Sequence, residues 1–170
     1  MADKNNDGRL DAFVCNDEGL SRIFINDGVG NLLYTPAQID LTTTPASDGS
    51  GSYGSVWSDV DNDGDPDLYI ARCKHGVDDP GDGRRINQLF WNNGNGTFTQ
   101  DLTNVSGLRI GAQSWTADFG DIDNDGDFDC LVTNHDVSSQ LLENDGAGHF
   151  TDISASSGVL NTITGLTAQG

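Results

Sequence analysis

The chain has 170 residues, of which 35% are apolar and 22 are glycine, and its formal net charge is −19. This length allows one domain with a fair core, and the low apolar content suits short strands and tight turns better than a helical globule. The acidity disfavours nucleic-acid binding, because phosphates would be repelled, and no apolar run approaches the roughly 18 residues of a membrane span.

An acidic nonapeptide recurs three times, at residues 3–11, 59–67 and 121–129. In each copy, oxygen-bearing Asp or Asn side chains stand at positions 1, 3, 5 and 9, and glycine stands at position 6. Such a set of hard oxygen donors suits a calcium ion best. The three copies contain three, five and five of the 27 acidic residues, so we expect carboxylate repulsion to destabilise the chain without metal.

Each nonapeptide is followed by an apolar run, a second apolar run, an Asn/Asp–Gly turn and a further short strand. Asn and Asp beside Gly favour hairpin turns because they adopt positive φ angles at little cost. In the first repeat these segments are residues 12–15, 22–26, 26–30 and 31–34. In the second repeat a strand at residues 55–58 precedes the loop, and the four segments after it are residues 68–71, 88–92, 92–96 and 96–99. In the third repeat a strand at residues 115–119 precedes the loop, and the four segments are residues 130–133, 140–144, 144–148 and 148–151.

Four short antiparallel strands per period predict an all-β protein built from three β-propeller-type blades. A loose stack of hairpins is the alternative, although lone hairpins are only marginally stable in water. We expect three blades to form an incomplete ring or part of a larger assembly, because propellers have about four to eight blades. The predicted repeats are residues 1–52, without a first strand, 53–111, with an insertion at 74–83, and 112–163, and residues 164–170 begin a further blade strand.

The D-x-[DN]-x-D-G-x-x-D loop, the apolar strand after it and the N-x-G-x-G-x-F turn together resemble the FG-GAP/VCBS repeat family, which also includes the propeller blades of integrin α-chains. The resemblance implies calcium in each hairpin loop, about three ions in all, and an extracellular or cell-surface location. It implies these side-chain ligands: Asp3, Asn5, Asp7 and Asp11; Asp59, Asp61, Asp63 and Asp67; Asp121, Asp123, Asp125 and Asp129. It also implies a backbone carbonyl ligand from each residue at position 7: Arg9, Asp65 and Asp127.

The first loop is the least anionic of the three, because Asn5 replaces an Asp and Arg9 lies nearby, so we expect it to bind calcium most weakly. An EF-hand would need a bidentate Glu at position 12 and flanking helices. Position 12 here is occupied by strand residues, Val14, Ile70 and Val132, which excludes that kind of site. Acidic turns that bind no metal remain the alternative for all three loops.

The sequence predicts no enzyme, because it contains no nucleophile elbow, zinc-ligand spacing or phosphate-binding glycine motif. An Asp/Glu pair for glycoside hydrolysis remains an alternative, although no carboxylate stands out from the metal loops. The three histidines are expected on the surface: His75, His135 and His149. The three cysteines are expected as small apolar residues of buried strands: Cys15, Cys73 and Cys130.

Two classes of function follow. The first is a non-enzymatic calcium-binding module for adhesion, assembly or scaffolding, with self-association or a protein partner at the 74–83 insertion, because propellers bind through loops. The alternative is a carbohydrate-binding or polysaccharide-active propeller. In that case, aromatic side chains that would otherwise pack between blades could stack on sugars: Tyr53, Trp57, Tyr69, Trp91 and Trp115.

Overall fold

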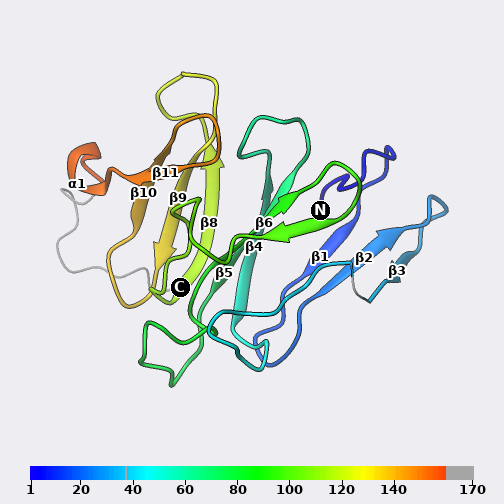
Figure 1. Ribbon diagram of the computed structural model, residues 1–170, viewed down its shortest axis with the longest axis horizontal. Helices are drawn as coiled ribbons and strands as arrows, with labels where there is room; N and C mark the ends of the chain where they lie inside the picture. The colour runs from blue at the N-terminus through cyan, green and yellow to red at the C-terminus, as the bar shows by residue number, and fades with distance from the viewer. Residues whose placement is uncertain (37, 160–170) are drawn as a thin grey trace.

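The computed structural model describes residues 1–36 and 38–159, and these residues form three antiparallel sheets (Figure 1). Sheet 1 consists of β1 (Ala12–Val14), β2 (Arg22–Asn26) and β3 (Leu32–Tyr34). Sheet 2 consists of β4 (Ser52–Ser58), β5 (Asp67–Arg72), β6 (Gln88–Asn92) and β7 (Phe98–Gln100). Sheet 3 consists of β8 (Ser114–Gly120), β9 (Asp129–Asn134), β10 (Gln140–Asn144) and β11 (Phe150–Asp152).

The prediction of an all-β antiparallel fold is confirmed. Within each sheet, neighbouring strands follow one another in the chain and pair antiparallel, so the sheets are built entirely from hairpin connections. A short helix that the sequence analysis did not predict, α1 (Ser154–Ser157), follows β11. No helix in the described part of the chain has the length and apolar character of a membrane span. The arrangement of the sheets as propeller blades stays a prediction, and the expected strand at 164–170 lies outside the described residues.

Sheets 2 and 3 have the same internal register. In sheet 2, Trp57 pairs with Leu68, which pairs in turn with Phe90. In sheet 3, Phe119 pairs with Cys130, which pairs with Leu142. The first strand of each sheet, β4 or β8, also carries a register shift near its start. Equivalent sequence positions therefore take equivalent places, which allows the sheets to be compared residue by residue.

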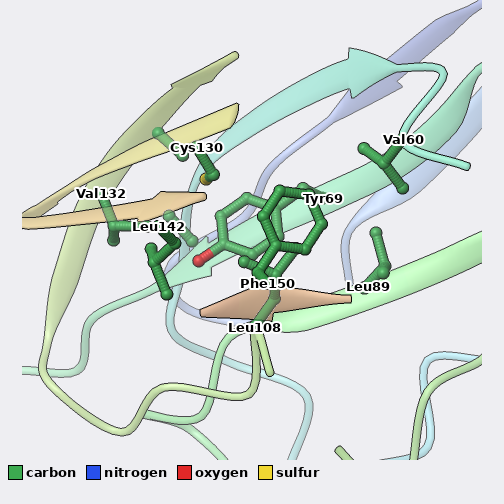
Figure 2. Close-up of a cluster of buried hydrophobic side chains, with 10 residues drawn as sticks. Val60, Tyr69, Leu89, Leu108, Cys130, Val132, Leu142 and Phe150 are labelled. Carbon is green, nitrogen blue, oxygen red and sulfur yellow. The ribbon is translucent and has the colours of Figure 1, made fainter. Parts of the chain in front are cut away.

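A first apolar cluster joins sheet 2 to sheet 3 (Figure 2). Tyr69 and Leu89 on one face of sheet 2 pack with Val132 and Leu142 from the facing side of sheet 3. The Tyr69 hydroxyl accepts a hydrogen bond from Asn87 Nδ2 at 2.6 Å, so its polar end is satisfied inside the core. The contact between these two sheets is therefore a packed interior of large apolar side chains.

A second apolar cluster lies on the opposite face of sheet 2. Leu68, Ile70 and Phe90 are fully buried there, and Phe13 of β1 packs against them together with side chains of the segment that follows sheet 1. Successive side chains of a strand point to opposite faces, and every residue of β5 is buried. Sheet 2 is therefore covered on both faces, and sheets 1 and 3 lie on either side of it (Figure 1).

The three cysteines are free thiols, and the prediction that they lie in buried strands is confirmed only for Cys130, because Cys15 and Cys73 come directly after β1 and β5. Cys73 and Cys130 are buried, whereas Cys15 lies just beyond β1 and is partly exposed. Burial raises the pKa of the Cys130 thiol, which lies in the apolar cluster between sheets 2 and 3. This thiol is therefore protonated at neutral pH and acts as a small apolar side chain.

Candidate metal centres

The second and third acidic loops connect the first two strands of sheets 2 and 3. Both loops curl through left-handed backbone conformations at position 4, where Asn62 has φ of 59° and Asn124 has φ of 64°. Position 6 is also left-handed, with φ of 95° at Gly64 and 98° at Gly126. Asn tolerates this region and Gly adopts it freely, so the repeated Asn-x-Gly spacing produces the same turn in each loop.

The first aspartate of the loop is anchored by backbone amides. The two oxygens of Asp59 accept hydrogen bonds from the N–H groups of Asp63 and Gly64, each at 3.0 Å. In the third loop, Asp121 accepts one from the N–H of Gly126 at 3.3 Å. These bonds orient the carboxylate toward the inside of the turn independently of any bound ion.

The last aspartate of the loop is buried and binds two separate backbone segments. Asp67 accepts hydrogen bonds from the N–H of Asn92 at 2.7 Å and from the N–H of Val60 at 3.0 Å. Burial, with a smaller contribution from the charges of nearby acids, raises the pKa of Asp67 to about 7 against the lowering effect of these two bonds. A cation at this loop would favour the ionised carboxylate and offset the cost of burying it.

Two groups of three aspartates bring carboxylate oxygens within 4.8 Å of one another, and they are the only such groups of acidic, His or Cys side chains in residues 1–36 and 38–159. They are Asp59, Asp61 and Asp67, and Asp121, Asp123 and Asp129. Burial raises the pKa of Asp61, and the charges of Asp63 and Asp59 raise it further. Asp61 Oδ1 is buried and has no hydrogen-bond partner. An ion bound among the carboxylates would supply that partner, so these residues fit a hard cation.

Positions 5 and 7 contribute differently from positions 1, 3 and 9. Asp63 and Asp125 each accept a hydrogen bond from the N–H two residues later, at 2.9 and 3.2 Å, and lie outside the groups of three. Asp127 at position 7 is buried and its Oδ1 has no partner. The sequence analysis assigned only a backbone role to this residue. The sequence signal for a side-chain role was the Asp at position 7, where the first loop has Arg9.

The first loop has the same backbone anchoring but a different charge arrangement. Asp3 accepts hydrogen bonds from the N–H groups of Asp7 and Gly8 at 3.0 and 2.7 Å. The Asp7 carboxylate, however, is bound by the Arg9 guanidinium at 2.5 Å and by Asn5 Nδ2 at 3.1 Å. The aspartates of this loop do not form one of the close groups of three. Because the Arg9 guanidinium binds the Asp7 carboxylate, it would compete with a cation for that ligand.

The first Asn of each hairpin turn has a second role that the sequence analysis missed. Asn92 Nδ2 donates to the carbonyl of Lys4 at 2.9 Å and to that of Pro66 at 3.1 Å. Asn144 Nδ2 donates to the carbonyl of Val60 at 2.8 Å. Lys4 and Val60 are both the second residue of the preceding loop. The turn Asn therefore links the first and second candidate metal loops to the next repeat. The presence of an Asn in all three turns was the only sequence signal for this role.

The aromatic candidates divide into two groups. Trp57, Tyr69 and Trp91 belong to the two apolar clusters between the sheets. Tyr53, at the start of β4, is exposed and lies edge-on to Trp115 with ring centroids 4.8 Å apart. Trp115 also contacts the ring of His135 at 5.3 Å. The second group is an aromatic surface cluster.

All three histidines are exposed, as predicted. His149 lies in the turn before β11, where its Nδ1 is 3.0 Å from Asp145 Oδ2. None of the three belongs to a close metal-binding group within the described part of the chain. The candidate metal chemistry is therefore that of carboxylate oxygens.

Comparison with known proteins identifies the family and a similar fold. No curated protein matches the chain. The fold is similar to that of an Agrocybe aegerita lectin, whose structure is described as the basis of specific recognition of non-reducing terminal N-acetylglucosamine. The TM-score is 0.52 and the identity 20% over 88% of this chain, which spans only 35% of the lectin chain. The FG-GAP-like repeat matches residues 3–70 and again residues 59–132. Because these matches together span most of its length, the chain belongs to the FG-GAP-like repeat family.

Proposed function

We propose that the chain is a non-enzymatic calcium-binding repeat module in which calcium stabilises the fold. The observation that carries this proposal is the pair of aspartate groups at the second and third loops, whose carboxylate oxygens lie within 4.8 Å of one another. An unpartnered, buried oxygen on Asp61 supports it. So many anionic oxygens, so close together, repel one another, and a bound cation would offset that repulsion.

The proposed ligands are the oxygens of positions 1, 3, 5 and 9, with the backbone carbonyl of position 7. In the second loop these are Asp59, Asp61, Asp63, Asp67 and the carbonyl of Asp65. In the third loop they are Asp121, Asp123, Asp125, Asp129 and the carbonyl of Asp127. The first loop would use Asp3, Asn5, Asp7, Asp11 and the carbonyl of Arg9, and it would bind most weakly because Arg9 neutralises Asp7.

Calcium would neutralise the carboxylates of the acidic loop and so hold the loop to the strands on either side. Asp67 binds the backbone of both its own loop and the following hairpin, so an ordered Asp67 fixes three strands of sheet 2 relative to one another. Asp129 makes the same pair of contacts in sheet 3, to Ile122 and Asn144. The ion would therefore be a structural component of each repeat.

The biological setting that fits this module is outside the cell or at the cell surface, in adhesion, assembly or scaffolding. Exposed calcium loops with few buried ligands suit the high calcium concentrations found there. In this proposal residues 1–52, 53–111 and 112–163 are the repeats, residues 164–170 begin a further blade strand, and the 74–83 insertion contacts a protein partner. Most residues of the insertion are exposed, which leaves them accessible to such a partner.

Calorimetric titration of the chelator-treated protein with calcium tests the binding directly. We expect two sites of similar affinity and one weaker site. Asp61→Asn should remove or weaken one of the two stronger sites. Asp78→Asn, in the exposed insertion, is the matched control for loss of one negative charge and should leave the titration unchanged. A titration without detectable binding heat at millimolar calcium, together with an unchanged melt, would refute the proposal.

A second candidate function is carbohydrate binding by the aromatic surface cluster of Tyr53, Trp115 and His135. The observations that favour it are the exposure of Tyr53 and His135 beside the half-buried Trp115 and the fold similarity to a lectin. Aromatic rings bind sugars by stacking on their apolar faces. A glycan array that includes terminal N-acetylglucosamine tests it. Binding that Trp115→Ala abolishes without lowering the melting temperature would support it, and an array without signal would exclude it.

A further inference from the structure

A continuous chain of hydrogen bonds runs from the last aspartate of the second loop to the last aspartate of the third loop. Asp67 Oδ2 accepts a hydrogen bond from the N–H of Val60 at 3.0 Å. The carbonyl of Val60 accepts one from Asn144 Nδ2 at 2.8 Å. The N–H of Asn144 donates to Asp129 Oδ1 at 2.9 Å. Two residues, Val60 and Asn144, are therefore enough to connect the two groups of aspartates.

All four residues of this chain lie in the interior of the protein. Their exposed fractions are 1% for Asp67 and Val60, 2% for Asp129 and 5% for Asn144. Val60 also belongs to the apolar cluster between sheets 2 and 3 (Figure 2). In a low-dielectric interior, hydrogen bonds that share a peptide group or an amide polarise one another. A change at one end of the chain is therefore felt at the other end.

The two ends of the chain are proposed calcium ligands. Asp67 and Asp129 each belong to a group of three aspartates whose oxygens lie within 4.8 Å of one another. The second oxygen of Asp67 accepts a hydrogen bond from the N–H of Asn92 at 2.7 Å. The second oxygen of Asp129 accepts one from the N–H of Ile122 at 3.0 Å. Because both oxygens are held, the orientation of each carboxylate depends on the backbone around it, and Asn144 is part of that backbone for Asp129.

We propose that calcium binding at the second loop and at the third loop is positively coupled through Val60 and Asn144. An ion at either loop raises the affinity of the other loop for its own ion, and by linkage the factor is the same in both directions. The inference rests on the proposed function, because it requires calcium at both loops, and it adds regulation: the two sites fill together over a narrow range of calcium. Asn144 is a positioning residue, because it acts on the ion through Asp129.

The coupling arises from order that the two sites share. An ion at the second loop would hold Asp67 in one orientation, which fixes the peptide group of Val60 and so the carbonyl that Asn144 binds. Asn144 in turn fixes Asp129, so the third loop would already have its last ligand in place. The loss of conformational freedom is then incurred once for two ions, which makes the second binding step more favourable.

The first loop lacks one bond of the equivalent chain. Asn92 Nδ2 donates to the carbonyl of Lys4, as Asn144 does to the carbonyl of Val60. Asp11 Oδ2, however, is buried and has no hydrogen-bond partner within residues 1–36 and 38–159. The path from the first loop to the second is therefore interrupted at Asp11, and the inference is confined to the second and third loops.

Long-range charge would produce coupling of the opposite sign. The second loop carries five aspartates, and a divalent ion bound there would make it less negative. A less negative second loop attracts a further cation more weakly, so direct electrostatics predicts that one ion lowers the affinity for the other. Salt at about 0.15 M screens this effect over distances beyond about 8 Å. The sign of the measured coupling therefore distinguishes the hydrogen-bonded chain from charge alone.

A calcium titration of the isotope-labelled protein, followed by NMR, tests the proposal. Gly64 and Gly126 report the two loops separately, because their N–H groups donate to Asp59 Oδ2 at 3.0 Å and to Asp121 Oδ2 at 3.3 Å. An ion bound to either aspartate should shift the resonance of the amide that donates to it. In the wild type the two glycine resonances should titrate together, and more steeply than a single independent site.

Removing one site should weaken the other. Asp61→Asn removes or weakens the second site, and we expect the midpoint for Gly126 to move to at least about fivefold higher calcium. Asp123→Asn is the reciprocal change and should move the midpoint for Gly64 by the same factor. Asp78→Asn, in the exposed insertion, removes one negative charge elsewhere and should move neither midpoint.

Asn144→Ala breaks the chain without changing any proposed ligand. In this background Asp61→Asn should no longer move the midpoint for Gly126. Asn26→Ala is the matched control, because Asn26 has the same turn position but donates to the carbonyl of Leu10 in its own loop. In that background the effect of Asp61→Asn should remain. If Asn144→Ala does not fold, the reciprocal pair of aspartate variants decides the question, since neither changes Asn144.

The outcomes separate this inference from the proposed function. Midpoints that stay unchanged when the other site is removed, or that move to lower calcium, overturn the coupling and leave calcium binding itself standing. An effect of Asp61→Asn that persists in full with Asn144→Ala overturns the route through Asn144. Calcium that shifts neither glycine resonance at millimolar concentration refutes the proposed metal function, and the coupling with it.

Discussion

Asn144 Nδ2 donates a hydrogen bond of 2.8 Å to the carbonyl of Val60, which lies 84 residues earlier in the chain. The bond connects a hairpin turn of sheet 3 to the candidate metal loop of sheet 2. Asn144 also donates to the carbonyl of Phe128 at 3.2 Å, next to the last aspartate of its own loop. One buried amide therefore joins two acidic loops, and the stability of each loop is coupled to the contact between sheets.

Replacing this asparagine should weaken the contact between repeats. Asn144→Ala removes the donor from the buried carbonyl of Val60 and from the partly buried carbonyl of Phe128, so we expect the free energy of unfolding to fall by about 1–3 kcal/mol in urea denaturation. Asn26→Ala is the matched control, because Asn26 occupies the same turn position but reaches only the carbonyl of Leu10. A larger loss for Asn26→Ala than for Asn144→Ala would contradict this role.

Removal of calcium should lower the melting temperature. A ligand present at 100 times its dissociation constant stabilises the folded state by about 2.7 kcal/mol per site. For a chain of this size, each kcal/mol corresponds to roughly 2–4 °C. We therefore expect melts with excess calcium and with excess chelator to differ by more than about 5 °C, when measured by circular dichroism. Coincident melts would mean that the acidic loops are stable without metal.

Changing Arg9 should strengthen the first loop. Its guanidinium binds the Asp7 carboxylate at 2.5 Å, which occupies a proposed calcium ligand. Arg9→Asp places at position 7 the residue that stands there in the other two loops, and we expect at least about tenfold tighter binding at the weakest site. Arg9→Ala removes the competing cation without adding negative charge, so calorimetry should give its first loop a calcium affinity between those of the wild type and Arg9→Asp. Equal affinity in all three proteins would show that Arg9 does not limit binding.

Asp101 should stabilise the fold in a pH-dependent manner. Burial raises its pKa, but hydrogen bonds from the Ser106 hydroxyl and from the N–H groups of Ser106, Val105 and Thr103 outweigh burial and lower it below its usual value. A lowered folded-state pKa gives stability that is present above the unfolded pKa of about 4 and is lost as pH falls through the folded value. Asp101→Asn should therefore destabilise the protein at neutral pH.

The pH dependence supplies the check on this assignment. Urea denaturation of wild type and Asp101→Asn at pH 7 and at about pH 3, each in excess calcium, should show a stability difference that shrinks at the lower pH. Changes in the metal loops affect both proteins equally and cancel in the comparison. A difference that is constant or grows on acidification would indicate that Asp101 contributes through shape rather than through its charge.

The local elements were predictable from the sequence because local contacts produce them. The left-handed residues Asn62 and Gly64 belong to the repeated Asn-x-Gly spacing, and the anchoring of Asp59 by Gly64 spans only five residues. Strand periodicity and Asn–Gly turns likewise predicted the hairpins of sheets 2 and 3. Interactions between near neighbours in the chain recur whenever the short motif recurs, so three copies of the nonapeptide were enough to predict three loops.

The tertiary structure alone decided which of two residues of the same type or the same repeat position is buried. Tyr53 and Tyr69 both lie in strands of sheet 2, yet the first is exposed and the second is inside the core. Val60 and Ile122 hold the same loop position and differ in exposure because sheet 3 covers the first of them. Burial depends on what packs against a face, and that partner is distant in the chain. The sequence by itself determined the acidic loops and their hairpins, while the packing of sheets decided how those loops are connected.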